Sequence, residues 1–134
     1  MTAHEHQHRV TYHETDKMGF VYYSNYLVYF EIGRTELIRA SGLAYRELED
    51  MGYCLPVIEA SCRYHKPALY DDLLVIRTRA SEFKGIRLGF DYEILREGIT
   101  LAEGKTLHAF MDAQGRPRKL DRLLKEKLDK AFNK

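Results

Sequence analysis

The chain has 134 residues, of which 45% are hydrophobic and 31% are charged, and its formal net charge is +1. This length suits one domain over residues 1–134, and the apolar content is too high for a disordered chain. The balanced charge favours no particular partner, and no stretch reaches the roughly 18–20 apolar residues that cross a bilayer. Cys54 and Cys62 form no CxxC pair, and the N-terminal segment lacks the apolar run of a signal peptide. We therefore expect a cytoplasmic protein in a reducing compartment.

The N-terminal segment is predicted to contain a short strand and a loop. Residues 1–7 are expected to be a mobile end, in which the alternating histidines could chelate a metal only adventitiously. Val10 and Tyr12 alternate with polar residues, which is typical of a strand over residues 8–13. Residues 14–23 are predicted to form the loop that follows.

A long helix is predicted to begin after this loop. Ser24 or Asn25 can cap it, because their side chains accept a hydrogen bond from a free backbone N–H. Its predicted apolar stripe consists of Leu27, Phe30, Leu37 and Ile38. Gly42 is the expected stop. Gly33 lies inside the helix, where Gly costs about 1 kcal/mol relative to Ala, so we expect a neighbouring backbone to approach closely there. A short second helix is predicted over residues 45–51.

The remaining sequence changes to a period of two, which indicates strands. The predicted strands cover residues 55–64, 73–83, 86–95 and 101–111. The breaks after the second, third and fourth of these strands have hairpin length, so antiparallel neighbours are expected. A final helix is predicted over residues 120–132, within a C-terminal segment of residues 119–134. One long helix followed by a run of strands indicates an α+β fold with an antiparallel sheet.

The loop carries a recognisable motif. Residues 12–26 read YHETDKMGFVYYSNY, in which an acidic residue and a small residue precede Asp16, and Gly19 and two aromatic residues follow it. This segment resembles the hotdog-fold acyl-CoA thioesterases, in the branch of 4-hydroxybenzoyl-CoA thioesterase and the Tol-Pal-associated thioesterases. Further matches run to about residue 117, and include Phe30-Glu31, Arg34, Glu36, Gly42, Tyr64, Lys66-Pro67-Ala68 and Tyr70-Asp71-Asp72-Leu73. The resemblance implies an antiparallel sheet wrapped around one long central helix.

The resemblance also implies a catalytic centre. Asp16 matches the catalytic carboxylate, which acts as nucleophile or general base, and an Asp that only terminates a loop is the ordinary alternative. Tyr23 lies seven residues after Asp16, where the family places the backbone N–H that polarises the thioester carbonyl. Gly19 would let the loop fold close against the ligand, or it serves as an ordinary turn glycine. Some Tol-Pal-associated members have His where this chain has Tyr23.

Candidate substrate-binding residues surround the motif. Tyr12 and Tyr22 either line the pocket or belong to the core, and Asn25 belongs to the motif. Phosphates of coenzyme A call for basic groups at the rim of the cleft, and ordinary solvated surface charge is the competing interpretation. The basic candidates are Arg63, His65, Lys66, Lys84 and Arg87. Glu31 and Arg34 are expected to pair on the long helix.

The predicted activity is hydrolysis of an acyl-CoA thioester to a carboxylic acid and coenzyme A. No cofactor, metal spacing or nucleic-acid motif is evident in the sequence. We expect a homodimer or a dimer of dimers (a homotetramer), because the family places its sites between subunits. The alternatives are a hotdog dehydratase, a non-catalytic acyl-binding or scaffold protein, and an enzyme that takes its thioester from acyl carrier protein. The sequence lacks the His-Phe-Pro context of the dehydratases.

Overall fold

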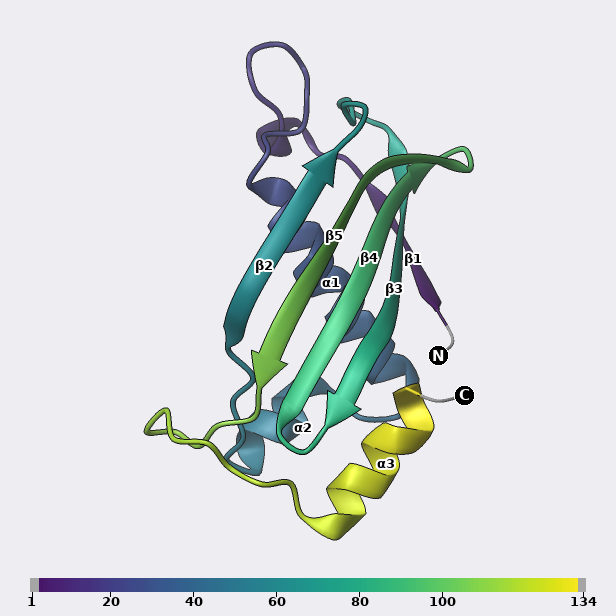
Figure 1. Cartoon of the computed structure of the whole chain (residues 1–134). Coiled ribbons are helices and arrows are strands. Elements are labelled where there is room, and N and C mark those ends of the chain that lie inside the picture. Colours follow the sequence, from purple (N-terminus) through teal and green to yellow (C-terminus); the bar gives the residue numbers. More distant parts are fainter. Residues whose placement is uncertain (1–2, 133–134) are drawn as a thin grey trace.

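The computed structural model describes residues 3–132 and shows one five-stranded antiparallel sheet wrapped around a long helix (Figure 1). The helices are α1 (Asn25–Ala40), α2 (Tyr45–Asp50) and α3 (Arg122–Phe132), and the strands are β1 (His4–Arg9), β2 (Val57–Tyr64), β3 (Leu73–Lys84), β4 (Arg87–Arg96) and β5 (Ile99–Ala109). The strand order β1-β3-β4-β5-β2 leaves β1 and β2 at the edges. The predicted α+β class and the sheet around one helix are confirmed. None of the helices in the described residues is long and apolar enough to span a membrane.

The first strand lies earlier than the sequence pattern predicted. Residues 4–7 pair with β3 instead of forming a mobile end, and the strand predicted over residues 8–13 already ends at Arg9. The strand was missed because its half-buried positions are occupied by histidines rather than aliphatic residues. Beyond β1 the chain turns into a 3-10 helix, Tyr12–Glu14, so Tyr12 does not share a face with the buried Val10. Residues 1–2 and 133–134 lie outside the described residues.

α1 presents one apolar face to the sheet, and its bounds match the prediction. Its buried residues are Tyr26, Tyr29, Phe30, Gly33, Leu37 and Ile38. Leu27, which was predicted to belong to this stripe, is 42% exposed because the buried face is rotated by about one position toward the tyrosines. Arg34 approaches the Tyr92 hydroxyl at 3.5 Å, and the expected pair with Glu31 is absent from the described residues.

Gly33 is the point at which α1 crosses β3. A Cβ atom at this position would lie 2.7 Å from Cγ2 of Ile76 and would also collide with the side chain of Thr78. We expected a neighbouring backbone here, but the close neighbours are two side chains. The glycine therefore offsets its low helix propensity by letting the helix pack closely against the sheet.

Turn chemistry sets the ends of the later elements. β4 and β5 form a two-residue hairpin in which Glu97 and Gly98 both have positive φ, so β5 begins at Ile99 rather than at residue 101. β2 begins at Val57 rather than at residue 55, because Pro56 has no N–H to donate to a ladder. α3 begins at Arg122 because the Asp121 carboxylate accepts the N–H of Leu124 at 2.8 Å and so caps the helix. The break after β5 leads to α3 and joins no two strands of the sheet.

A chain of buried polar groups crosses the core between β4, β5 and the segment before β2. Nδ1 of His108 lies 3.2 Å from the Leu55 carbonyl oxygen, so this nitrogen carries the proton of a neutral ring. Nε2 of His108 then accepts from the Thr106 hydroxyl at 2.8 Å, and the Thr106 oxygen accepts from the Tyr92 hydroxyl at 2.6 Å. Burial, aided by the charge of Arg34, lowers the pKa of His108 to about 4. The core therefore holds this histidine neutral.

Acid should destabilise the fold through His108. As the pH falls from 6.5 to 5, His108 becomes protonated in the unfolded chain. In the folded chain it stays neutral until about pH 4. The free energy of unfolding should therefore drop by about 2 kcal/mol over this range. Denaturant unfolding of the wild type and of His108→Gln at both pH values checks this, because Gln does not titrate and the other histidines are common to both chains. Equal losses in the two proteins would contradict the prediction.

Candidate active site

The motif loop is a closed hairpin-like turn at one end of the molecule, beside the start of α1 (Figure 1). Thr15 and Val21 form an isolated antiparallel bridge. Next to it, the N–H of Asp16 donates to the Phe20 carbonyl at 2.8 Å. The two stems of the loop are thus tied together, and Asp16 stands at a defined position in the turn.

The Asp16 carboxylate organises the tip of this turn. Oδ1 accepts the N–H of Met18 at 2.9 Å and the N–H of Phe20 at 3.2 Å. Gly19 has φ +79°, a conformation that side chains disfavour, and its N–H donates to the Asp16 carbonyl at 3.0 Å. Oδ2 makes no hydrogen bond within residues 3–132. In the single chain Asp16 is exposed, with one carboxylate oxygen free for chemistry.

A second segment, residues 64–72, supports the loop from behind. The N–H of Val21 donates to the Ala68 carbonyl at 2.8 Å, and the N–H of Tyr70 donates to the Gly19 carbonyl at 3.1 Å. The segment is in turn held to β4 by an ion pair between Arg96 and Asp72, 2.6 Å long. The loop is therefore attached to the sheet on one side and to α1 on the other.

The start of α1 departs from the predicted capping. Ser24 is the N-cap residue, but its side chain makes no capping hydrogen bond, and Asn25 Nδ2 instead donates to the Glu14 carbonyl at 2.8 Å. Tyr22 N–H donates to the same carbonyl at 2.9 Å. In the described part of the chain, the N–H of Tyr23 meets no acceptor. A free N–H at the positive end of a helix is suited to bind a developing oxyanion.

The aromatic candidates are on the surface of the single chain. Tyr12 is 78% exposed and Tyr23 is 62% exposed, and Tyr22 is also exposed. The core interpretation of Tyr12 and Tyr22 is therefore wrong. Tyr12 packs edge-on against Tyr70, with ring centroids 5.6 Å apart, and both lie at the loop end of the molecule. The Tyr64 hydroxyl donates to the Tyr23 carbonyl at 3.0 Å, a contact that the sequence did not predict.

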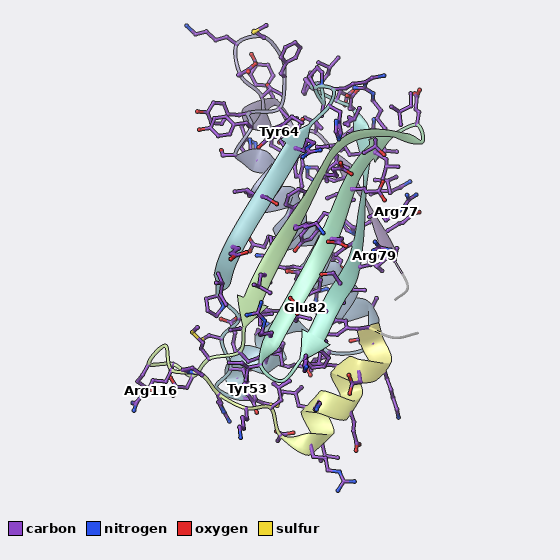
Figure 2. The ribbon with its side chains drawn as sticks, viewed as in Figure 1. Tyr53, Tyr64, Arg77, Arg79, Glu82 and Arg116 are labelled. Carbon is purple, nitrogen blue, oxygen red and sulfur yellow. The ribbon has the colours of Figure 1, made fainter. Side chains whose placement is uncertain are left out.

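The basic candidates divide between the two ends of the sheet. Arg63, His65 and Lys66 lie at or beyond the end of β2 that contacts Tyr23, and His65 Nε2 is 3.3 Å from a Glu103 carboxylate oxygen. Figure 2 shows Tyr64 at this end and Glu82 far along the sheet.

Lys84 and Arg87 lie at the other end, in the β3–β4 hairpin. β3 runs for 12 residues away from the loop, roughly 35 Å, and Arg87 faces Glu82 at 3.8 Å. Within one subunit, Lys84 and Arg87 therefore do not reach the motif loop.

The outer face of the sheet carries a separate, shallow hollow of about 610 Å³. Charged residues of both signs line it, including Arg77, Arg79, Asp91 and Lys105 (Figure 2 labels the two arginines). Arg79 and Lys105 both contact Asp91, at 3.5 and 3.2 Å. These cross-strand ion pairs neutralise much of the charge that lines the hollow. We therefore interpret the hollow as a solvated face of the sheet rather than as an extension of the loop site.

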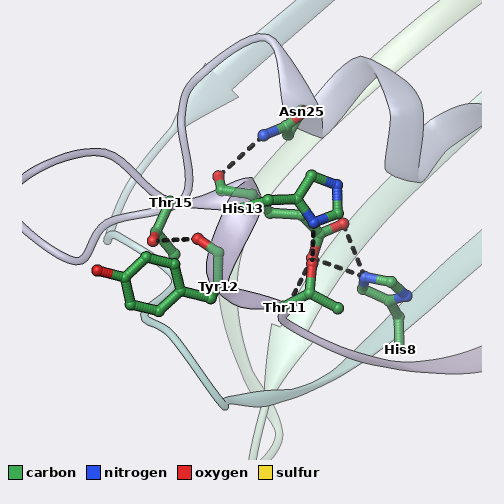
Figure 3. A network of polar contacts seen from close by, with 7 residues as sticks. His8, Thr11, Tyr12, His13, Thr15 and Asn25 are labelled. Carbon is green, nitrogen blue, oxygen red and sulfur yellow. Dashed lines mark hydrogen bonds and ion pairs between the residues drawn. The ribbon is translucent and has the colours of Figure 1, made fainter.

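Glu14 is a site residue to which sequence analysis gave no role. Its side chain is buried at the base of the loop, in contact with His8 and Thr11 (both labelled in Figure 3) and close to Tyr29. Burial disfavours the Glu14 carboxylate, but the Thr11 N–H and the contacts with His8 outweigh burial, so the pKa of Glu14 lies below its usual value. The only signal in the sequence was its place in the motif, two residues before Asp16.

Comparison with known proteins agrees with this geometry. The family model of the Thioesterase-like superfamily matches residues 10–131. The chain belongs to this family. The acyl-CoA thioesterase YbgC of Haemophilus influenzae is 33% identical over 105 residues, which cover 78% of this chain and 77% of that protein. This finding confirms the predicted thioesterase family.

Solved structures of similar thioesterase-like chains confirm the hotdog fold. The DHNA-CoA thioesterase of Staphylococcus aureus superposes with a TM-score of 0.91 at 28% identity, covering 99% of this chain and 90% of that one. A protein of Thermus thermophilus, described as hypothetical, gives a TM-score of 0.90 at 33% identity, covering 95% and 98%. The sheet and the long helix of this thioesterase-like chain are therefore shared across nearly its whole length.

Proposed function

We propose that this thioesterase-like protein hydrolyses acyl-CoA thioesters, with Asp16 as the catalytic carboxylate and the Tyr23 backbone N–H as the oxyanion donor. One observation supports this proposal above the others: the motif loop holds Asp16 by two backbone N–H bonds to Oδ1 and leaves Oδ2 without a partner in the described residues. The free Tyr23 N–H lies at the helix end of the same loop. The names of relatives such as YbgC agree with an acyl-CoA substrate.

The chemistry follows from these two groups. As general base, Asp16 takes a proton from water, and the resulting hydroxide attacks the thioester carbonyl carbon. As nucleophile, the carboxylate attacks that carbon itself, and the C–S bond breaks to give an anhydride and the coenzyme A thiolate. Water then hydrolyses the anhydride. In both routes the carbonyl oxygen gains negative charge that the Tyr23 N–H stabilises. In the general-base route the C–S bond breaks after the attack of hydroxide. In both routes the thiolate of coenzyme A leaves and is protonated, and the carboxylic acid is released. Gly19 keeps the turn compact beside the incoming thioester.

The activity test measures free thiol released from a panel of short aliphatic, long aliphatic and aromatic acyl-CoAs. The wild type should hydrolyse at least one member, and Asp16→Asn should not. Equal thiol release by both proteins, or by neither, would contradict the proposal and favour a non-catalytic acyl-binding or scaffold protein. Comparing each acyl-CoA with the same acyl group on acyl carrier protein separates the two thioester donors. Cys54 is a free, exposed cysteine, so each protein needs a blank without substrate to subtract any signal from its own thiol.

We also propose that the site works in a homodimer formed through β2. This edge strand exposes Val57, Ile58 and Tyr64, each over close to half of its surface, and its outer ladder groups have no partner strand among residues 3–132. Pairing with a second copy would satisfy these groups and cover the apolar side chains beside the loop.

Light scattering on the purified protein should therefore give a mass of two or four times the 15.7 kDa chain. Replacing Ile58 by Lys should lower that mass. A monomer at micromolar concentration would contradict the dimer.

A further inference from the structure

Glu14 is the one acidic side chain that is buried among the described residues, with 8% of its surface exposed. Burying a carboxylate is costly unless several donors compensate it. Both carboxylate oxygens lie close to His8 Nε2, at 3.0 and 3.1 Å, and Oε1 also accepts the N–H of Thr11 at 2.8 Å. The Tyr29 hydroxyl is buried on the α1 side of this cluster and completes no hydrogen bond in the described residues. The base of the loop thus holds a buried carboxylate whose burial is compensated by Thr11 and His8.

The backbone of the same residue holds the start of α1. The Glu14 carbonyl accepts the N–H of Tyr22 at 2.9 Å. It also accepts Nδ2 of Asn25 at 2.8 Å, a contact that Figure 3 shows. These two contacts fix the chain on either side of Tyr23, whose own N–H is free. One residue therefore links β1, the first turn of the loop and the helix start.

We propose that Glu14, anchored by His8, is a positioning residue that sets the orientation of the Tyr23 N–H toward the reacting carbonyl. This inference rests on the proposed function. Glu14 does not touch the substrate, so its loss should leave ground-state binding largely intact. The oxyanion forms only in the transition state, and a donor misplaced by about 1 Å can cost about 100-fold in rate. The effect should therefore appear in kcat rather than in KM.

The chain offers a matched control in α2. Glu47 accepts the N–H of Ala44, three residues earlier, as Glu14 accepts that of Thr11. Glu47→Ala thus removes the same kind of local capping bond far from the loop. His8→Gln keeps an N–H donor for the Glu14 carboxylate, whereas His8→Leu removes it. His8→Gln should therefore retain the kcat that His8→Leu loses.

The experiment compares these variants in steady-state hydrolysis of the best acyl-CoA and in amide hydrogen exchange. Glu14→Ala should lower kcat about 10- to 100-fold with KM within about twofold, and should speed exchange of the Tyr22 amide. His8→Leu should act in the same direction, while His8→Gln and Glu47→Ala should keep kcat within about threefold of the wild type.

The outcomes separate the two proposals. If Asp16→Asn is inactive but Glu14→Ala keeps its kcat per folded molecule, the positioning role is wrong and the proposed function stands. If Tyr22 exchange in Glu14→Ala matches the wild type, the positioning role is wrong whatever the activity. If Asp16→Asn keeps full activity, the proposed function fails, and the positioning role with it.

Discussion

Replacing Asp16 by Asn should lower kcat for the best acyl-CoA by about 10²–10⁴-fold, the range typical for losing a general base. The Asn side-chain oxygen can still accept the N–H groups of Met18 and Phe20, so the turn should survive. The neutral amide, however, can neither attack a carbonyl carbon nor take a proton from water. Steady-state hydrolysis with thiol detection measures the change, with circular dichroism to confirm the fold.

Asp71→Asn is the matched control for this experiment. Asp71 is also an exposed aspartate on the segment that supports the loop, and its φ of 70° is one that Asn tolerates well. Its replacement should leave kcat within about twofold of the wild type. An Asp16→Asn protein that turns over within tenfold of the wild type would show that Asp16 is only a turn residue.

Replacing Gly104 by Ala should destabilise the fold by about 3 kcal/mol, at the upper end for an overpacked site. A Cβ atom here would lie 2.5 Å from Cζ of Phe30 and 2.5 Å from the Ser61 carbonyl oxygen. The Phe30 ring is fully buried and stacks on the Tyr92 ring, with the ring centroids 4.3 Å apart, so it has no space into which to move. The Ser61 oxygen belongs to the backbone of β2. The sheet or the helix must therefore shift.

Denaturant unfolding of Gly104→Ala beside Lys105→Ala checks this prediction. Lys105 is the next residue on the same strand and is exposed, so its loss should change stability by no more than about 0.5 kcal/mol. Adding Phe30→Leu to Gly104→Ala should cost less than the sum of the two single changes, because the smaller side chain removes part of the clash. If Gly104→Ala lowers the free energy of unfolding by less than about 1 kcal/mol, the prediction is wrong, because β2 and β5 then accommodate the added methyl group without strain.

The sequence by itself determined the elements that have a strong local pattern. The α+β class, the bounds of α1 and the β3–β4–β5 hairpins were predicted correctly, because helical spacing, period-two alternation and turn glycines act over a few residues. The motif around Asp16 also identified the thioesterase family before any contact was known. β1 was missed because its inward positions are histidines, which carry no apolar signal.

Only the tertiary structure decided which distant groups meet. In the folded chain His8 of β1 contacts Glu14, and the Tyr64 hydroxyl donates to the Tyr23 carbonyl. Lys84 and Arg87 are separated from the loop by the length of β3. These relations depend on strand order and register, which bring together residues far apart in the chain. A local pattern reports which face of an element is buried, but it contains no information about the partner that the face will contact.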